Sequence, residues 1–252
     1  LGEARVNSWH GNYKLAEDQL NECISLGRKY QQTKIIADAK YHLALISLNK
    51  NKYKASMLII DSAIKIASSE HLQGRLAKYY DCKGLIYKFI GKLEQAIEMH
   101  EKALTLSNKI NDKHGYRKYL NNQGLIFEEK ADFEKAMSVY AECLIISKEM
   151  NEKRSICVSY CNIGYILEYQ GVKDQALKYF RRALNLSKKI KYKAGIGGYS
   201  NNIAKIYIKK MQFNKAISFL NDAIKILDEL ESIDSIFCLI GRAFCYMNLD
   251  NK

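Results

Sequence analysis

The chain has 252 residues, of which 48% are hydrophobic and none is proline. This length and apolar content suffice for one large or two ordinary folded domains, and the absence of proline removes the strongest helix breaker. The formal net charge is +13. The basic residues are spread over the whole chain without a dense run, which favours a solvated surface over a nucleic-acid-binding tract.

Membrane insertion and disulfide bonding are not expected. No apolar run approaches the roughly 18 residues that a transmembrane helix needs, and no signal peptide is visible. The seven cysteines are an odd number and lie within helical patterns rather than loops. We therefore expect reduced thiols and a cytoplasmic location.

The same pattern of small and apolar residues recurs every 40 residues along the chain. One position holds Gly84, Gly124 and Gly164, with Ala44 and Ala204 as small replacements. A second position holds Ile46, Ile86, Ile126, Ile166 and Ile206. A third position holds Ala16, Ala96, Ala136, Ala176 and Ala216. A fourth position holds Cys23, Ala63, Ala103, Cys143, Ala183 and Ala223. A fixed period in this range is typical of stacked-repeat proteins.

In chain order, the repeats predict one continuous solenoid over residues 1–252. A partial repeat covers 1–33, five full repeats cover 34–73, 74–113, 114–153, 154–193 and 194–233, and a partial repeat covers 234–252. Each full repeat predicts two helices joined by a tight turn, for example about Gly74 to Ile90 and about Leu93 to Ile110. Because both ends of the chain fall inside repeats, we interpret it as a piece of a longer protein.

The spacing of Gly84, Tyr87, Gly91, Ala96 and Ala103 resembles the tetratricopeptide repeat. The usual repeat has about 34 residues. The longer unit here resembles kinesin light chain, cell-polarity adaptors, bacterial peptide-pheromone receptors, and repeat domains fused to bacterial sensor kinases or transcription regulators. The resemblance implies an all-α, right-handed superhelical solenoid whose first helices line a concave groove. It also implies a protein- or peptide-binding module, the partner-sensing part of a larger regulatory protein.

An asparagine ladder is the most informative candidate site. Asn122, Asn162 and Asn202 occupy one position of three successive first helices, whereas His42 and Cys82 fill it earlier. Asparagine is neither a good helix former nor a typical core residue. Its amide can donate and accept hydrogen bonds at the same time, so the ladder predicts capture of an extended peptide backbone. The resemblance implies the same role, because asparagine at this position binds peptide backbone in those families. The alternative is that these amides cap or cross-link neighbouring helices.

Side chains beside the ladder would recognise the side chains of such a peptide. The predicted contact residues are Lys118, Asn121, Tyr165, Tyr169, Asn201 and Lys205. Aromatic residues with mixed charge suit a protein or peptide partner, although an isolated tyrosine at helical spacing can equally be a packing residue. Two other functions stay open, namely self-association through exposed repeat ends and, less favoured, binding of nucleic acid by a basic surface.

No catalytic or metal-binding constellation is apparent. Cys157 and Cys161 could share one helix face, but tetrahedral zinc needs two further ligands, so packing is expected. Gly195, Gly197 and Gly198 precede a predicted helix but lack the spacing of a phosphate-binding loop. We expect a flexible turn there. The histidines form no pattern with a nucleophile, so we predict no enzyme activity, no metal and no cofactor.

Overall fold

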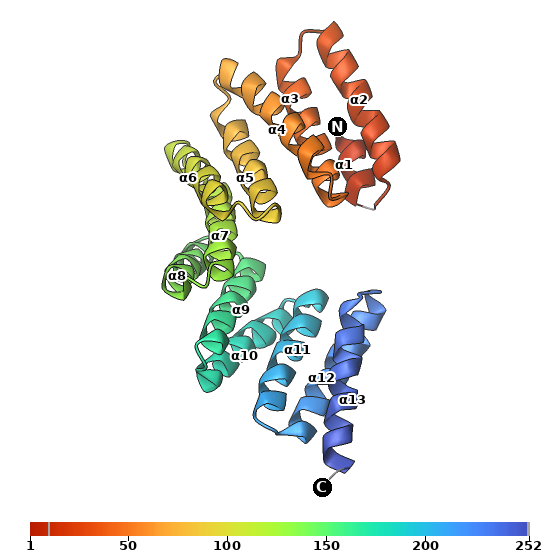
Figure 1. Cartoon of the computed structure of the whole chain (residues 1–252), viewed down its shortest axis with the longest axis vertical. Helices are drawn as coiled ribbons and strands as arrows, with labels where there is room; N and C mark the ends of the chain where they lie inside the picture. The colour runs from red at the N-terminus through yellow and green to blue at the C-terminus, as the bar shows by residue number, and fades with distance from the viewer. Residues whose placement is uncertain (10, 251–252) are drawn as a thin grey trace. The chain divides into compact units, whose positions relative to one another are not determined.

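The computed structural model describes residues 1–9 and 11–250, and within them the chain forms thirteen α-helices and no strand (Figure 1). The predicted all-α class is therefore confirmed. The helices, in chain order, are α1 (Gly2–Trp9), α2 (Tyr13–Lys29), α3 (Thr33–Asn49), α4 (Tyr53–Ser69), α5 (Gln73–Phe89), α6 (Leu93–Lys109), α7 (Lys113–Glu129), α8 (Phe133–Glu149), α9 (Lys153–Tyr169), α10 (Lys173–Lys189), α11 (Lys193–Lys209), α12 (Phe213–Glu229) and α13 (Asp234–Asp250).

The helices are uniform in length and spacing. Each helix from α2 to α12 has 17 residues, and a new one begins every 20 residues, so that two helices make one unit of the 40-residue pattern. The odd-numbered helices are the first helices of the repeats and the even-numbered ones are the second helices. The predicted helices from Gly74 to Ile90 and from Leu93 to Ile110 correspond to α5 and α6 within one residue at each end.

The helices end at tight turns that contain a residue with positive φ. After α5, Gly91 has a φ of 76°, its N–H donates to the Lys88 carbonyl, and the Lys92 N–H donates to the Tyr87 carbonyl, both at 2.9 Å. This pair of bonds satisfies carbonyl groups at the end of the helix and stops it. The predicted turn at Ala131 and Asp132 has the same form, with a φ of 56° at Ala131.

Internal contacts divide the chain into two units, Leu1–Asp132 and Phe133–Lys252. The repeated isoleucines belong to the core of both units. Ile46, Ile86 and Ile126 are fully buried in the first unit, and Ile166 and Ile206 are fully buried in the second. Burial of one such side chain stabilises the fold by about 1.5–3 kcal/mol.

In two of the first helices, the repeated glycine makes room for a large side chain of the second helix. A Cβ on Gly164 would lie 2.6 Å from Cε1 of the buried Phe180 ring. A Cβ on Gly84 would lie 2.8 Å from Nε2 of the buried His100 ring. Glycine at these positions is therefore a packing requirement, because no larger residue fits without movement of a buried ring.

The prediction of a flexible turn at Gly195, Gly197 and Gly198 is wrong, because all three residues lie inside α11. A Cβ on Gly195 would lie 2.4 Å from Cδ1 of Tyr192, and one on Gly197 would lie 2.8 Å from Cδ2 of Leu227. Close packing by neighbouring side chains thus outweighs the low helix propensity of glycine at Gly195 and Gly197.

The seven cysteines are all free thiols, and only Cys23 is not fully buried. Cys143 is buried as predicted. None of the described helices has the length and apolar character needed to cross a membrane.

Candidate peptide-binding surface

Polar side chains of successive first helices meet at fixed sequence separations. Nδ2 of Asn122 donates to Oδ1 of Asp81 at 2.7 Å in the first unit, and Nδ2 of Asn202 donates to Sγ of Cys161 at 3.4 Å in the second. Both pairs are 41 residues apart. One repeat is 40 residues, so each polar side chain contacts a residue one position before its own equivalent on the preceding first helix.

In the first unit, a buried carboxylate holds two of the predicted site residues. Asp81 on α5 is only 1% exposed, and besides Asn122 it accepts a hydrogen bond from Nζ of Lys118 at 2.9 Å. Nδ1 of His100 on α6 lies 3.2 Å from the same carboxylate. Burial alone would raise the pKa of Asp81, but His100 and the charged Lys118 outweigh it and hold that pKa below its ordinary value.

Asn122 and Lys118 both keep part of their surface exposed to solvent. Asn122 is half-buried, and within the described residues its Oδ1 accepts no hydrogen bond. The Lys118 side chain is 48% exposed. Asn121 is half-buried and has interactions within the chain. Asn122 thus combines an amide fixed at one end by Asp81 with an oxygen that can accept from a ligand.

In the second unit, Asn202 is an internal cross-link. It is 5% exposed, and its Oδ1 accepts a hydrogen bond from the Tyr165 hydroxyl at 2.8 Å while its Nδ2 bonds Cys161. The Tyr165 ring packs edge-on against Phe180, with 5.4 Å between ring centroids. Asn202 and Tyr165 therefore link neighbouring first helices, which is the alternative to peptide capture.

The other predicted residues of the second unit are more accessible. Tyr169 is 62% exposed and stacks on Phe133 at the start of α8, with 5.6 Å between the ring centroids. Lys205 is exposed, and Asn201 and Asn162 are half-buried. Asn162 also has interactions within the chain. The structure therefore positions Tyr169 through a second helix and leaves its ring open to solvent.

Sequence reasoning missed Asp81, which holds Asn122 and Lys118, and His100, which lies beside Asp81. A signal was present, because Asp81 occupies the position that Tyr41, Asn121, Cys161 and Asn201 fill in other repeats. An acid at a buried position of a first helix requires compensating donors. The donors could not be named from the sequence, because they lie 37 and 41 residues away.

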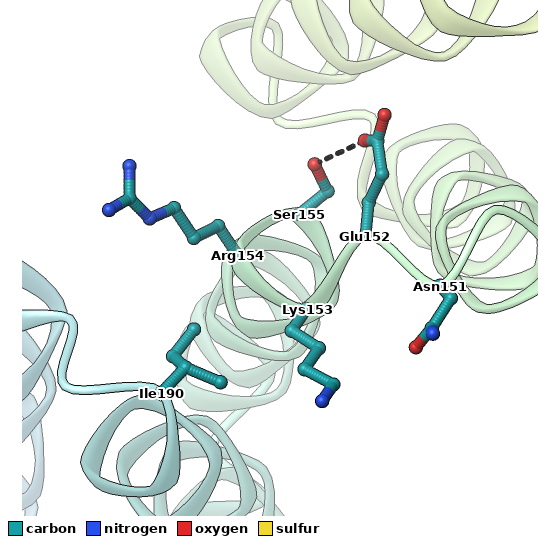
Figure 2. Close-up of a pocket in the computed structure, with 6 residues that line it drawn as sticks. All are labelled: Asn151, Glu152, Lys153, Arg154, Ser155 and Ile190. Atoms are coloured by element: carbon teal, nitrogen blue, oxygen red, sulfur yellow. Dashed lines mark hydrogen bonds between the residues drawn. The ribbon is translucent and has the colours of Figure 1, made fainter.

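A separate pocket of the second unit is lined by Asn151, Glu152, Lys153, Arg154, Ser155 and Ile190 (Figure 2). The Ser155 hydroxyl donates to Glu152 at 2.8 Å, and the Arg154 side chain extends away from that pair. Glu152 is the N-cap residue of α9, so this bond is a contact within the start of a helix. Among the described residues, no group of three or more His, Cys, Asp or Glu could hold a metal ion.

Comparison with known sequences gives a consistent family assignment. A family model described as "Tetratricopeptide repeat" matches residues 74–149, and a second model with the same description matches residues 158–190 and 198–226. Together these matches cover more than half of the chain. No curated protein matches the chain in sequence.

Solved structures share the fold at low sequence identity. A signal-transduction ATPase of Pyrococcus horikoshii with a tetratricopeptide repeat sensor aligns with 97% of this chain at a TM-score of 0.82 and 18% identity, and the chain spans 38% of that protein. BtubC (BKLC) of P. vanneervenii aligns with 85% of this chain and 91% of its own length, at a TM-score of 0.73 and 18% identity.

A third structure is a Rap protein complexed with Competence and Sporulation Factor. It aligns with 86% of this chain and 64% of its own length, at a TM-score of 0.70 and 15% identity. Identities this low establish the shared fold and carry no binding residues from one protein to another.

Proposed function

Because the chain belongs to the tetratricopeptide repeat family, we propose that it is a non-catalytic module that holds an extended segment of a partner protein against its first helices. The observation that carries the proposal is the arrangement of Asn122. Asp81 fixes the amide through Nδ2, and Oδ1 accepts no hydrogen bond within the described residues. A backbone N–H of the partner can therefore donate to a preorganised acceptor, which lowers the entropy lost on binding.

Lys118 supplies a second contact in the same unit. Its ammonium group bonds Asp81 while nearly half of the side chain is exposed. An ammonium group has three donors, so it can keep Asp81 and still donate to a backbone carbonyl or a carboxylate of the partner. Asn122 and Lys118 together suit an extended partner segment in which a backbone N–H group binds Asn122 and a nearby carbonyl or carboxylate binds Lys118.

In the second unit we propose Asn162, Asn201, Lys205 and Tyr169 as the contacting residues. Tyr169 offers an exposed aromatic ring that is already held by Phe133, and such rings are common anchors at protein interfaces. Asn202 and Tyr165 have a positioning role in this proposal, because their mutual hydrogen bond joins α9 to α11.

We further propose that the module is the partner-sensing part of a larger regulatory protein. The archaeal ATPase, which this chain resembles over its repeat region, carries its repeats as a sensor. The similar Rap protein was solved as a complex with Competence and Sporulation Factor. The seven free thiols suit a reducing compartment, so we propose a cytoplasmic location.

The test is capture of partners from nuclease-treated lysate of the source cell at near-physiological salt. The baits are the wild-type chain, Asn122→Ala and Asn202→Ala, and retained proteins are identified by mass spectrometry and then bound directly as purified segments. Asn122→Ala removes one donor from the buried Asp81, so circular dichroism first checks that the variant is folded. We expect the folded variant to lose a partner that the wild type retains. Equal retention by the folded variant would remove Asn122 from the site.

The nuclease treatment separates this proposal from nucleic-acid binding by the basic surface. Binding through phosphates falls steeply as salt rises. A ligand that disappears with nuclease and with moderate salt, and that binds Asn122→Ala as well as the wild type, would favour the basic surface instead.

Self-association is a second candidate function, favoured by the apolar face of α13. The face is formed by exposed Phe237, Ile240, Phe244 and Met247, which are three or four residues apart and so lie on one side of the helix. A second copy of the chain could cover this face. Light scattering across a range of concentrations tests it, because a molecular mass that stays monomeric at every concentration excludes the candidate.

A further inference from the structure

An apolar pocket lies at the edge of the first unit, where the start of α4, the end of α5 and the start of α6 meet. It has a volume of about 640 Å³ and is lined by Tyr53, Lys54, Met57, Leu58, Tyr87, Ile90 and Lys92. These helices follow one another in the chain and pack in that order (Figure 1). The pocket, here called the edge pocket, shares no residue with the candidate peptide-binding surface.

The edge pocket occurs where an ion pair found in other repeats is missing. Glu94 pairs with Lys130 one repeat later, and Asp174 pairs with Lys210 in the second unit. In each pair the two residues are 36 positions apart. The equivalent residues at the edge pocket are Lys54 and Ile90. Because a lysine and an isoleucine replace the acid and the base, no ion pair closes this edge.

Leu58 is a second departure from the repeat pattern. Its side chain is 74% exposed, although the equivalent residues are polar in the other repeats, namely Asp18, Glu98, Ser138, Lys178 and Ser218. Beside it, Tyr53 stacks on the exposed Phe89 ring, with 6.2 Å between ring centroids and an interplanar angle of 8°. Clustered exposed apolar side chains that are rimmed by polar groups mark interaction sites.

The charged residues that line the edge pocket are both lysines. Lys54 and Lys92 are exposed, neither forms a hydrogen bond or ion pair within the described residues, and no carboxylate lines the pocket. The helices α4 and α6 begin there, and their N-cap residues, Lys52 and Lys92, make no side-chain cap hydrogen bond. The first turn of α4 holds no acidic residue, so the partial positive charge of that helix N-terminus adds to the charge of Lys54. In the first turn of α6, Glu94 is paired with Lys130.

We propose that the edge pocket binds a short segment of another protein in which one bulky aromatic or aliphatic side chain is flanked by Asp or Glu. The apolar side chain packs against Met57, Leu58 and Tyr87, and the flanking carboxylates meet Lys54 and Lys92. The volume falls within the range of about 300–1,000 Å³ that is typical of ligand pockets. The site is additional to the proposed first-helix surface and does not depend on it.

Methyl-labelled methionine provides a direct test, because Met57 lines the edge pocket and is one of only six methionines. The full chain with ¹³C-methyl methionine is titrated with an acetylated, amidated peptide of sequence Asp-Glu-Phe-Asp-Glu. The control peptides replace the central Phe by Ala or all four acids by Lys. We expect a saturable shift of the Met57 signal with the first peptide only, and no shift of the exposed Met211 signal.

The matched variant restores the ion pair of the other repeats by Lys54→Glu together with Ile90→Lys. These residues already occupy the equivalent positions at Glu94 and Lys130, so the variant is expected to fold with an unchanged or higher Tm. It should lose at least about tenfold in affinity for the acidic peptide, which corresponds to about 1.4 kcal/mol. A milder variant, Leu58→Ser, should weaken binding without changing the charge.

Other results would overturn the proposal. An unmoved Met57 signal at millimolar peptide, or equal shifts with all three peptides, would exclude an acidic apolar ligand. A Met57 shift that depends on protein concentration alone would assign the edge pocket to a second copy of the chain. A third result would be that the wild type sediments with phosphatidylserine-containing vesicles while the double variant does not, and that the Met57 signal does not respond to the peptide. That combination would assign the edge pocket to an anionic membrane surface.

Discussion

The hydroxyl of Tyr165 donates to Oδ1 of Asn202 across 2.8 Å and so joins α9 to α11. Asn202 is almost fully buried, so loss of the hydroxyl would leave its oxygen without a replacement from water. We expect Tyr165→Phe to lower the free energy of unfolding by about 1–3 kcal/mol. Urea denaturation followed by circular dichroism measures this change.

Tyr169→Phe is the matched control for that variant. The Tyr169 ring is exposed and is held by stacking on Phe133 rather than through its hydroxyl. Removal of this hydroxyl should change the free energy of unfolding by no more than about 0.5 kcal/mol. Equal effects of the two substitutions would show that the bond to Asn202 does not stabilise the fold.

The buried carboxylate of Asp81 predicts a pH-dependent contribution to stability. His100 and Lys118 overcome the effect of burial and hold its pKa below that of an unfolded chain. Its stabilisation is therefore present above the unfolded pKa of about 3.9 and is lost as pH falls through the lower folded value. We expect Asp81→Asn to cost about 1–3 kcal/mol at neutral pH.

The cost of Asp81→Asn should shrink when unfolding is measured below about pH 4, because the wild type then loses the same interaction. Asp174→Asn serves as the control, since Asp174 forms an exposed ion pair with Lys210 that solvent screens. A cost of Asp81→Asn that is the same at both pH values would contradict a depressed pKa.

Glycine positions inside helices should respond in opposite directions to the same substitution. Gly164→Ala places a methyl group 2.6 Å from the buried Phe180 ring, and such overpacking costs about 1–3 kcal/mol. Gly198→Ala meets no atom within 4 Å in α11, so helix propensity should raise stability by up to about 1 kcal/mol. Thermal unfolding of both variants tests this, and destabilisation by Gly198→Ala would contradict it.

The helices could be predicted because the 40-residue period places the same residue types at every core position. Ile86, Ile126 and Ile166 are each fully buried as the pattern requires. The glycines of α11 could not be predicted in the same way. Their sequence is typical of a turn. Only the neighbours Tyr192 and Leu227 explain why glycine is needed at Gly195 and Gly197 inside a helix.

The contacts of the candidate site depend on which side chains of neighbouring first helices meet, and the 40-residue period does not give this information. The period identifies equivalent residues, but the side chains that meet are 37 or 41 residues apart, as with Tyr165 and Cys161 around Asn202. These separations are set by how one first helix is displaced along the next. The sequence therefore predicted a line of asparagines but not their partners, which are Tyr165 and Cys161 for Asn202 and Asp81 for Asn122. Peptide capture by these asparagines stays a prediction.

The turns between helices offer a final test, because their positive-φ residue is often not glycine. Met211 has a φ of 57° and an exposed side chain, so Met211→Gly should raise the free energy of unfolding by about 0.5–1 kcal/mol. This is the left-handed backbone cost of about 1–2 kcal/mol less the extra entropy that glycine loses on folding. Gly171→Ala, at a φ of 80° with no atom near its Cβ, should lower stability by a similar amount. Urea denaturation of both variants measures these changes. If both substitutions changed the free energy of unfolding in the same direction, backbone strain would not control these turns.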